Sequence, residues 1–327
     1  MKFDFLTIGG LTEDIVFFSQ EGFLIDNPGD LLRQKLLAFE HGAKINIEEV
    51  KMSFGGGAAN SAVSLAKLNF RVACLGALGS DDRATRILDN LKQAKVDYQK
   101  VSLHKTCQSG FSFILNDQKD RIIFAYRGAN ELLRVEAQHK NIIKNSAWVY
   151  LTSLPNNYLS SLKNIFAYKN KIAWNPGLKQ LAGDIKRIKP FLEKTDILLL
   201  NKDEGLELIK KSKLSQGLSD DFLNNSKNLI LLLKQLGPEK IVLTDGLKGA
   251  YFYDGENFYH QKIVKSKKNV DTTGVGDAFN STVVGFLYKL TGDYTQAMFY
   301  GAKNAASLVS KVGAQNGLLT LKELKNN

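Results

Sequence analysis

The sequence is poor in cysteine and histidine, which argues against several kinds of site. The only cysteines among its 327 residues, Cys74 and Cys107, cannot build a disulfide framework, and their spacing matches no zinc motif. The four histidines are isolated from one another along the chain, so we expect them to be structural or exposed residues rather than metal ligands.

Long apolar runs are also missing. The stretches around Leu198 and Leu231 are far too short to span a bilayer, and residues 1–8 have the pattern of a charged strand rather than a secretory leader. We therefore expect a cytoplasmic protein with no membrane partner. No internal repeat or low-complexity linker interrupts the chain.

Charge is plentiful but dispersed. Apolar residues make up 44% of the chain and charged residues 24%, values of an ordinary globular protein, and the formal net charge is +11. The densest basic cluster, Lys265, Lys267 and Lys268, has no nearby aromatic residue on which a base could stack, so we expect no nucleic-acid partner. The positive potential does favour a polyanionic nucleotide.

Short apolar segments alternate with amphipathic ones along most of the chain. This order is typical of a parallel sheet covered by helices on both faces, so we expect a single α/β domain over residues 1–327 with three α/β/α layers. The expected strands are residues 5–9, 72–75, 148–151, 172–175, 197–201 and 240–244, and examples of the helices are 58–68, 82–92, 158–166 and 226–236.

Two insertions, at about 15–52 and 96–127, break this alternation. In the second, residues 110–115 and 121–126 flank the polar turn 116–120, which predicts a β-hairpin. Strands inserted into a domain of this kind commonly cover an active-site cleft. A lid, a dimer contact, both, or a purely structural sheet remain open alternatives.

The strongest functional signal is the segment 271–277, Asp-Thr-Thr-Gly-Val-Gly-Asp, which stands before a predicted helix at 278–290. Gly274, Val275 and Gly276 bring bare backbone N–H groups to the helix N-terminus, where the unpaired donors and the dipole attract an anion. An anion developing on a transferring phosphoryl group would be stabilised there.

Asp277 falls in the first turn of that helix, where it can accept the proton of a hydroxyl beside the phosphate. The helix dipole should lower the pKa of this carboxylate and weaken it as a base, which phosphoryl transfer tolerates if the proton is lost late. No Gly-x-x-x-x-Gly-Lys-Ser/Thr segment and no protein-kinase signature is present, so both of those classes are excluded.

A second glycine cluster, Gly-Gly-Gly-Ala-Ala-Asn at 55–60, precedes another helix. It fails as a dinucleotide fingerprint because the third glycine is missing and it does not open the first βαβ unit, which disfavours an oxidoreductase. As a close-approach surface for a polyhydroxylated ligand it fits, because small residues admit the ligand and the Asn60 amide can both donate and accept.

Segment 55–60, continued by Leu-Gly-Ala-Leu-Gly-Ser-Asp-Asp at 75–82, resembles the N-terminal signature of the ribokinase family, also called the PfkB carbohydrate kinases. Segment 271–277 resembles that family's C-terminal signature, with Val275 where alanine is usual. The resemblance covers nearly the whole chain. It implies a three-layer α/β/α fold with a small β-sheet lid and ATP-dependent phosphorylation of a sugar hydroxyl.

The resemblance also implies residue roles. Asp14 would bind sugar hydroxyls in a pocket with Gly56, Gly57 and Asn60. Asn201 and Glu204 match an Asn-x-x-Glu motif that organises Mg²⁺ and the phosphates of ATP. The remaining nucleotide-binding positions would be Thr244, Gly246, Gly249, Thr273 and Asn304, with the turn at 313–314 beside the adenine. Some relatives hold K⁺ on backbone carbonyls, for which Asp271, Thr273 and Gly313 are candidates.

The match to ribokinase itself is incomplete. Gly57 stands where ribokinase tends to carry lysine, and residues 151–155 contain no acid, which argues against free ribose as the acceptor. Arg127 could bind a carboxylate or phosphate on a sugar acid or sugar phosphate. A nucleoside is also open, with Phe23, Phe113 or Phe124 stacking on its base.

We therefore expect an ATP-dependent kinase of a sugar or sugar derivative. A nucleoside kinase is the alternative within the enzyme class, and a non-catalytic ligand-binding paralogue is the alternative outside it. Retention of both Asp277 and the glycine cradle argues against the last, since a protein without catalysis needs no base. A homodimer through the lid also remains open.

Overall fold

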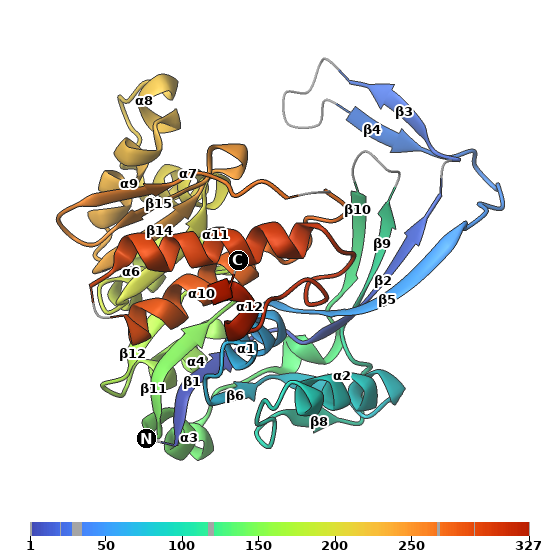
Figure 1. The fold of residues 1–327 in the computed structure, drawn as a ribbon, viewed down its shortest axis with the longest axis horizontal. Helices are drawn as coiled ribbons and strands as arrows, with labels where there is room; N and C mark the ends of the chain where they lie inside the picture. Colours follow the sequence, from blue (N-terminus) through green and yellow to red (C-terminus); the bar gives the residue numbers. More distant parts are fainter. Residues whose placement is uncertain are drawn as a thin grey trace.

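An eight-stranded sheet forms the centre of the computed structural model, which describes residues 2–19, 21–27, 35–116, 121–266, 269–290 and 292–326 (Figure 1). The strand order is β16-β15-β14-β13-β12-β11-β1-β6. Its parallel strands are β1 (Phe3–Ile8), β6 (Val72–Leu75), β11 (Ser146–Leu151), β12 (Lys171–Trp174), β13 (Ile197–Asn201) and β14 (Lys240–Thr244). At one edge, β15 (Ala250–Tyr253) and β16 (Phe258–Gln261) run antiparallel. Every strand expected from the sequence is present, within about two residues at each end.

Helices cover both faces of this sheet, and the strands alternate their side chains between two cores. In β13, Ile197 and Leu199 enter one core and Leu198 and Leu200 the other. The first core packs under α1 (Gly57–Lys67), α2 (Asp82–Gln93), α10 (Val275–Lys289) and α11 (Tyr294–Val309). The second packs under α3 (Lys140–Lys144), α4 (Tyr158–Ile165), α6 (Ile185–Leu192), α7 (Lys202–Ser212) and α9 (Ser226–Lys234). The three-layer prediction is confirmed.

Shorter elements complete the chain. They are the helices α5 (Leu178–Leu181), α8 (Asp220–Asn224) and α12 (Leu321–Asn326), the 3₁₀ turns η1 (Gly128–Leu132), η2 (Ala137–His139) and η3 (Gly246–Lys248), and the paired strands β7 (Ala77–Gly79) and β8 (Ser102–His104). None of the helices in the described part of the chain combines the length and apolar composition that a membrane crossing needs.

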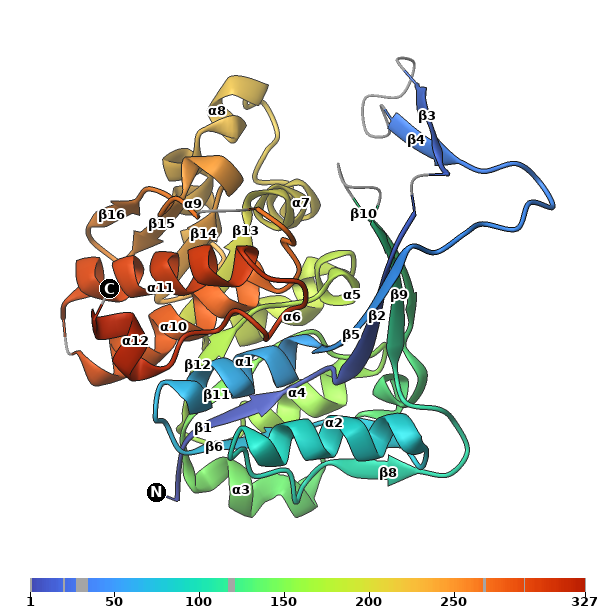
Figure 2. The same ribbon diagram turned by 45° about the vertical axis from the view of Figure 1, so that its right-hand side comes forward.

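A second, small sheet stands beside the central one (Figure 2). Its order is β10-β9-β2-β5, where β2 is Thr12–Phe18, β5 is Glu49–Gly55, β9 is Phe111–Asn116 and β10 is Arg121–Tyr126. Both predicted insertions supply strands to it. The predicted hairpin exists as β9 and β10, with Asn116 opposite Arg121, and the remainder of its predicted turn, 117–120, lies outside the described residues.

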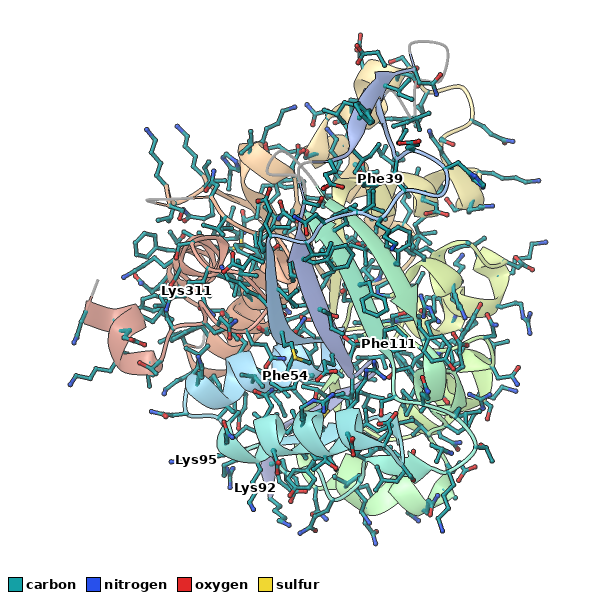
Figure 3. All side chains as sticks on the ribbon, turned by 90° about the vertical axis from the view of Figure 1, so that its right-hand side faces the viewer. Phe39, Phe54, Lys92, Lys95, Phe111 and Lys311 are labelled. Atoms are coloured by element: carbon teal, nitrogen blue, oxygen red, sulfur yellow. The ribbon has the colours of Figure 1, made fainter. Side chains whose placement is uncertain are left out.

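The small sheet has one attached face and one open face. Val16 and Ile114 are buried against Val312, in the turn that follows α11. The side chains exposed elsewhere on it include Val50, Met52, Phe113, Ile123, Phe124 and Tyr126. In Figure 3 this sheet faces the viewer, with Phe54 and Phe111 labelled on it.

A further hairpin, β3 (Phe23–Asp26) with β4 (Lys35–Ala38), projects beyond the small sheet (Figures 1 and 2). The sequence analysis did not predict these strands. Phe23 and Leu24 are exposed on it, and Phe39, labelled in Figure 3, follows β4.

Candidate active site

Two helices begin side by side at glycines, and their first turns are joined. The residue before α1 is Gly56 and the residue before α10 is Gly274, and neither helix has a side-chain cap. The Ala58 N donates to the Gly10 carbonyl (3.2 Å) and the Val275 N donates to the Thr272 carbonyl (3.4 Å), so an anion would meet mainly the other N–H groups of these first turns, such as that of Gly276. From α1, the Asn60 Nδ2 donates a hydrogen bond of 2.9 Å to Oδ2 of Asp277 in α10. The two glycine clusters singled out in the sequence therefore meet.

The cradle, defined as Gly274, Val275 and Gly276, needs glycine at its first position. Gly274 has φ +75°, and a Cβ there would lie 2.5 Å from Cβ of Ala314. Helix α10 starts at Val275, three residues before the predicted start, so Asp277 does lie in its first turn. A Cβ on Gly276 would meet nothing within 4 Å, because this residue faces open space.

Asp277 is partly buried, and the loss of hydration raises its pKa to about 6 while the hydrogen bond from Asn60 opposes the rise. The sequence analysis expected the helix dipole to lower this pKa. That expectation was wrong, because the loss of hydration outweighs the helix terminus. A carboxyl group with a pKa near 6 is a stronger base than an exposed aspartate and is still mostly ionised at pH 7.

Asp271 orders the turn that leads into the cradle. Its Oδ1 accepts hydrogen bonds from the backbone N (2.8 Å) and Oγ1 (2.7 Å) of Thr273, and its Oδ2 accepts one of 2.9 Å from the Gly313 N. The three residues proposed for a K⁺ site therefore share one carboxylate. The Thr273 side chain is directed to Asp271.

A cavity of about 520 Å³ opens beside the cradle, and we call it the α11 cavity. Val275 and Gly276 line it together with Thr244, Gly246 and Gly249, all predicted for the nucleotide site. Gly249 has φ +90°, and a Cβ there would lie 2.1 Å from the Gln261 carbonyl oxygen, so close packing requires glycine. Thr273 had been predicted to bind the nucleotide, but it is the neighbouring Thr272 that lines the cavity. The α11 wall consists of Ala302, Ala305, Ala306 and Val309.

Asn304 does not line this cavity, which corrects its predicted role. Its side chain is fully buried, donating to Oγ1 of Thr282 (2.8 Å) and accepting from the Leu319 N (2.9 Å). The cavity wall follows the i, i+3, i+4, i+7 positions of α11, and Asn304 lies on a different side of the helix. The small residues at this spacing in the sequence could have indicated which face of α11 lines the cavity.

Asn201 and Glu204 form a reciprocal cap at the start of α7. The Asn201 Oδ1 accepts from the Glu204 N (2.8 Å), and the Glu204 Oε2 accepts from the Asn201 N (2.9 Å). Asn201 is also opposite Thr244, on the neighbouring strand. Burial, together with the negative charge of Asp277, raises the pKa of Glu204. In the described residues, no group of three or more His, Cys, Asp and Glu residues is arranged to hold a metal.

Asp14, Gly56, Gly57 and Asn60, which we call the Asp14 cluster, gather where β2, β5 and α1 meet. Asp14 is 4% exposed, accepts a hydrogen bond of 3.2 Å from Thr12 Oγ1, and its pKa is raised by burial. A Cβ on the neighbouring Gly55 would lie 2.1 Å from Asp14 Oδ2.

Glycines in the Asp14 cluster allow close backbone packing. Gly56 has φ +91°, and a Cβ there would lie 2.3 Å from the Gly10 carbonyl oxygen. Asn130, which the sequence analysis missed, fixes the same loop because its amide donates to the Leu11 carbonyl (2.8 Å) and accepts from the Leu11 N (2.9 Å). No periodic pattern in the sequence marks such a contact across 119 residues.

Arg127 follows β10, and its guanidinium is partly exposed. Its Nε lies 3.7 Å from Oε1 of Glu131, which also accepts a 2.6 Å hydrogen bond from Nζ of Lys179. Among the contacts of the described residues, none joins Arg127 to Asp14 or Asn60. In the described residues Arg127 is thus paired with Glu131, and the other four predicted acceptor residues lie on neighbouring elements, β2, the end of β5 and α1.

Comparisons with known proteins identify the family to which the chain belongs. Residues 30–321 match the model of the pfkB family carbohydrate kinases. The chain is 26% identical over 291 residues to ribokinase of Staphylococcus aureus, covering 86% of this chain and 91% of that protein. It is 25% identical over 285 residues to a nucleoside kinase of Methanocaldococcus jannaschii, covering 86% and 87%.

Among solved structures, Arabidopsis thaliana ribokinase complexed with ribose and ATP superposes with a TM-score of 0.78 at 20% identity, covering 100% of this chain and 98% of that one. This likeness concerns the fold. The match to the family model covers most of the chain, and the protein therefore belongs to the pfkB family of carbohydrate kinases, which are phosphotransferases acting on a hydroxyl group.

Proposed function

We propose that the protein transfers the γ-phosphoryl group of ATP to a hydroxyl of a sugar or sugar derivative, with Asp277 as the base. The observation that carries the proposal is the position of Asp277. It is a partly buried carboxylate in the first turn of α10, beside Gly276 of the α11 cavity and hydrogen-bonded to Asn60 of the Asp14 cluster.

In this mechanism the acceptor oxygen forms a bond to the γ-phosphorus while the bond to the β,γ-bridging oxygen breaks and ADP leaves. The hydroxyl proton goes to Asp277. The backbone N–H groups of the cradle, Gly274 to Gly276, stabilise charge on the transferring group, and the Val275 N–H gives up its long 3.4 Å hydrogen bond to the Thr272 carbonyl to do so. Lys262 and Lys265, which line the α11 cavity, attract the polyanionic nucleotide.

Mg²⁺ fits the donor set at the start of α7. It prefers oxygen ligands and is commonly bound by one or two carboxylates together with substrate phosphates, where it neutralises phosphate charge. Glu204 has a second carboxylate oxygen beyond the one used in its cap, and the neighbouring charge of Asp277 favours a cation nearby. Asn201 orients Glu204 from the same turn.

K⁺ is a candidate ligand of the backbone carbonyls of Asp271, Thr273 and Gly313, three residues that the Asp271 carboxylate holds together.

We also propose that the small sheet acts as a lid over the acceptor, since it supplies Asp14. The apolar side chains on its open face, such as Val50 and Phe124, support dimerisation through the same sheet.

Two acceptor classes remain in competition. Small residues and buried Asp14 suit a polyhydroxylated sugar, and Arg127 suits one with a carboxylate or phosphate. A nucleoside is favoured by the likeness to the M. jannaschii nucleoside kinase. Phe113 is opposite Ile15 and Phe124 is opposite Phe113, so both rings lie on the open face of the small sheet, away from Asp14, and do not support stacking on a base there.

The deciding experiment is ADP release with sugars, sugar acids, sugar phosphates and nucleosides, in the presence of Mg²⁺ and K⁺. We expect turnover confined to one of these classes. If no acceptor in the panel raises the rate of ADP release above the rate without acceptor, the kinase proposal would be contradicted and a ligand-binding protein would be favoured. If a sugar acid or phosphate is the acceptor, Arg127→Gln should raise its KM, whereas Lys179→Gln, which removes the other cation on Glu131, should not.

A further inference from the structure

Three side-chain amides form a continuous chain that ends on Asp277. The Nδ2 of Asn90 donates to Oε1 of Gln315 (2.8 Å), Nε2 of Gln315 donates to Oδ1 of Asn60 (3.0 Å), and Nδ2 of Asn60 donates to Oδ2 of Asp277 (2.9 Å). The inner members, Asn60 and Gln315, are 5% and 6% exposed. Asn90 lies on α2 and is only partly buried.

This chain has a direction, because a primary amide donates at one end and accepts at the other. Ionised Asp277 only accepts, so Asn60 must turn its NH₂ group toward it and its oxygen toward Gln315. Gln315 must then present its own NH₂ group, which leaves its oxygen for Asn90. A reversed Asn60 would place its oxygen against the carboxylate, where two acceptors repel.

Gln315 is also held by the segment that organises the cradle. It belongs to the turn 312–317, in which the Gly313 N donates to Asp271 and the Asn316 Nδ2 donates to the Val312 carbonyl (2.7 Å). Gly313 has φ +92°, and a Cβ there would lie 2.6 Å from Ser53 Cβ. One turn thus contacts the segment leading into the cradle, the partner of the base and the small sheet.

We propose that Gln315 is a positioning residue, supported by Asn90, which holds the Asn60 amide in the orientation that donates to Asp277. The inference rests on the proposed role of Asp277 as the base. Among the described residues, the side chain of Gln315 hydrogen-bonds to Asn60 and Asn90 and is not part of the α11 cavity lining. It acts through Asn60.

Other groups face Asp277 and must stay constant in any test. Tyr150 of β11 is buried beside it, and the nearby negative charge together with burial raises the pKa of this phenol. Glu204 of α7 lies close enough for each carboxylate to feel the other. Neither residue hydrogen-bonds to Gln315 within the described chain, so a change at Gln315 leaves both in place.

The sharpest variant is Gln315→Met, which keeps the length of the side chain and removes both hydrogen bonds. Donation from Asn60 stabilises the ionised form of Asp277, so losing its fixed orientation should raise the pKa of Asp277. In the free enzyme, the pH titration of the Asn60 side-chain amide, followed by NMR and assigned by its absence in Asn60→Ser, should move its midpoint upward by about 0.5–1 pH unit.

The matched control is Gln180→Met. Gln180 is fully buried and donates to the Leu154 carbonyl (2.8 Å), so it has similar burial and hydrogen bonding in a different part of the fold. It should lower the thermal midpoint to a similar degree without moving the Asn60 titration. An unchanged titration in a folded Gln315→Met protein would overturn the inference, as would an equal shift in the control.

Kinetics with whichever acceptor the panel identifies give a second readout. Gln315→Met should lower kcat by roughly 10-fold with unchanged ATP affinity, and the acidic limb of the kcat/KM profile should move in the same direction as the NMR midpoint. If Gln315→Met fails to fold, Asn90→Ala at the outer end of the chain should give a smaller shift of the same sign, and no shift there would contradict the inference.

Asp277→Asn, measured alongside, separates this inference from the proposed function. Near-normal turnover of Asp277→Asn would show that Asp277 is not the base, which would contradict the proposed function and the positioning role with it. If Asp277→Asn loses turnover but the pH profile of Gln315→Met is unchanged, only the positioning role of Gln315 would be contradicted, and Asp277 would remain the proposed base.

Discussion

The α11 cavity and the Asp14 cluster draw their residues from different layers of the molecule. The cavity is formed by β14, η3, the cradle and α11, which belong to the central sheet and the helices on it, together with residues 262–266 of the segment that follows β16. Asp14 belongs to the small sheet, and Gly56 stands at the junction of that sheet with α1. Movement of the small sheet would therefore change the cluster far more than the cavity.

This difference assigns separate tasks to the two regions. A cavity built on buried strands and a long helix is pre-organised for a ligand that every reaction uses, such as the nucleotide. If the small sheet acts as the proposed lid, a cluster that depends on it can adapt to its ligand and close on it. Asp277 and Asn60 join the regions through one hydrogen bond.

The largest effect is expected from Asp277→Asn, which removes the proposed base and leaves the α11 cavity and the Asp14 cluster otherwise intact. Turnover should fall by about 10²–10⁴, the range for a positioned general base, while ATP still binds. ADP release and ATP titration calorimetry on the same preparation provide the measurement. Turnover within a few-fold of the parent would contradict the mechanism.

Asp14→Ala should affect only the acceptor region. Removal of a buried carboxylate that binds hydroxyls should raise the acceptor KM by roughly 10- to 100-fold with ATP affinity unchanged, since a hydrogen bond to a charged group contributes about 1.5–3 kcal/mol. Steady-state kinetics with each ligand varied in turn test this. Equal losses for both ligands would show that Asp14 does not belong to the acceptor side alone.

Two glycines of the cradle allow an internal comparison. Gly276→Ala adds a methyl group in open space at the cavity, so folding should be preserved while turnover falls by about 10-fold as phosphate approach is hindered. Gly274→Ala should lower stability by roughly 1–3 kcal/mol, through its left-handed φ and the contact with Ala314. Denaturant unfolding and ADP release on both variants separate the effects, and an equal loss of stability in Gly276→Ala would contradict this assignment.

The donor region could be predicted from the sequence further than the acceptor region. Val275 and Gly276 were predicted because a glycine-opened helix is a local feature of the chain, and Gly246 and Gly249 were predicted from the family resemblance; all four line the α11 cavity. Asn304 was misplaced because helix register depends on packing, and the dipole argument at Asp277 failed because burial cannot be read from seven residues. The contacts of Asn130 and Gln315 join segments more than one hundred residues apart, so no local pattern announces them.

The smallest effect concerns stability at Asp277. Its pKa is raised on folding from its ordinary value of 3.8 to about 6, so folding disfavours the ionised form, and the parent protein should become more stable as pH falls from above 6 toward 4. Asp277→Asn carries no charge and lacks this dependence, so it should be more stable than the parent at pH 8 by on the order of 2 kcal/mol.

That advantage of Asp277→Asn should shrink to about 0.5 kcal/mol near pH 4, where the parent carboxyl is protonated when folded and a little under half protonated when unfolded. Urea unfolding of both proteins from pH 4 to pH 8 measures the difference, with Asp254→Asn as the control, because hydrogen bonds lower the pKa of Asp254 and its replacement should produce the opposite trend. A constant difference between parent and Asp277→Asn across this range would mean that Asp277 is not held in a dehydrated site. That result would contradict the proposal that Asp277 acts as the base between the α11 cavity and the Asp14 cluster.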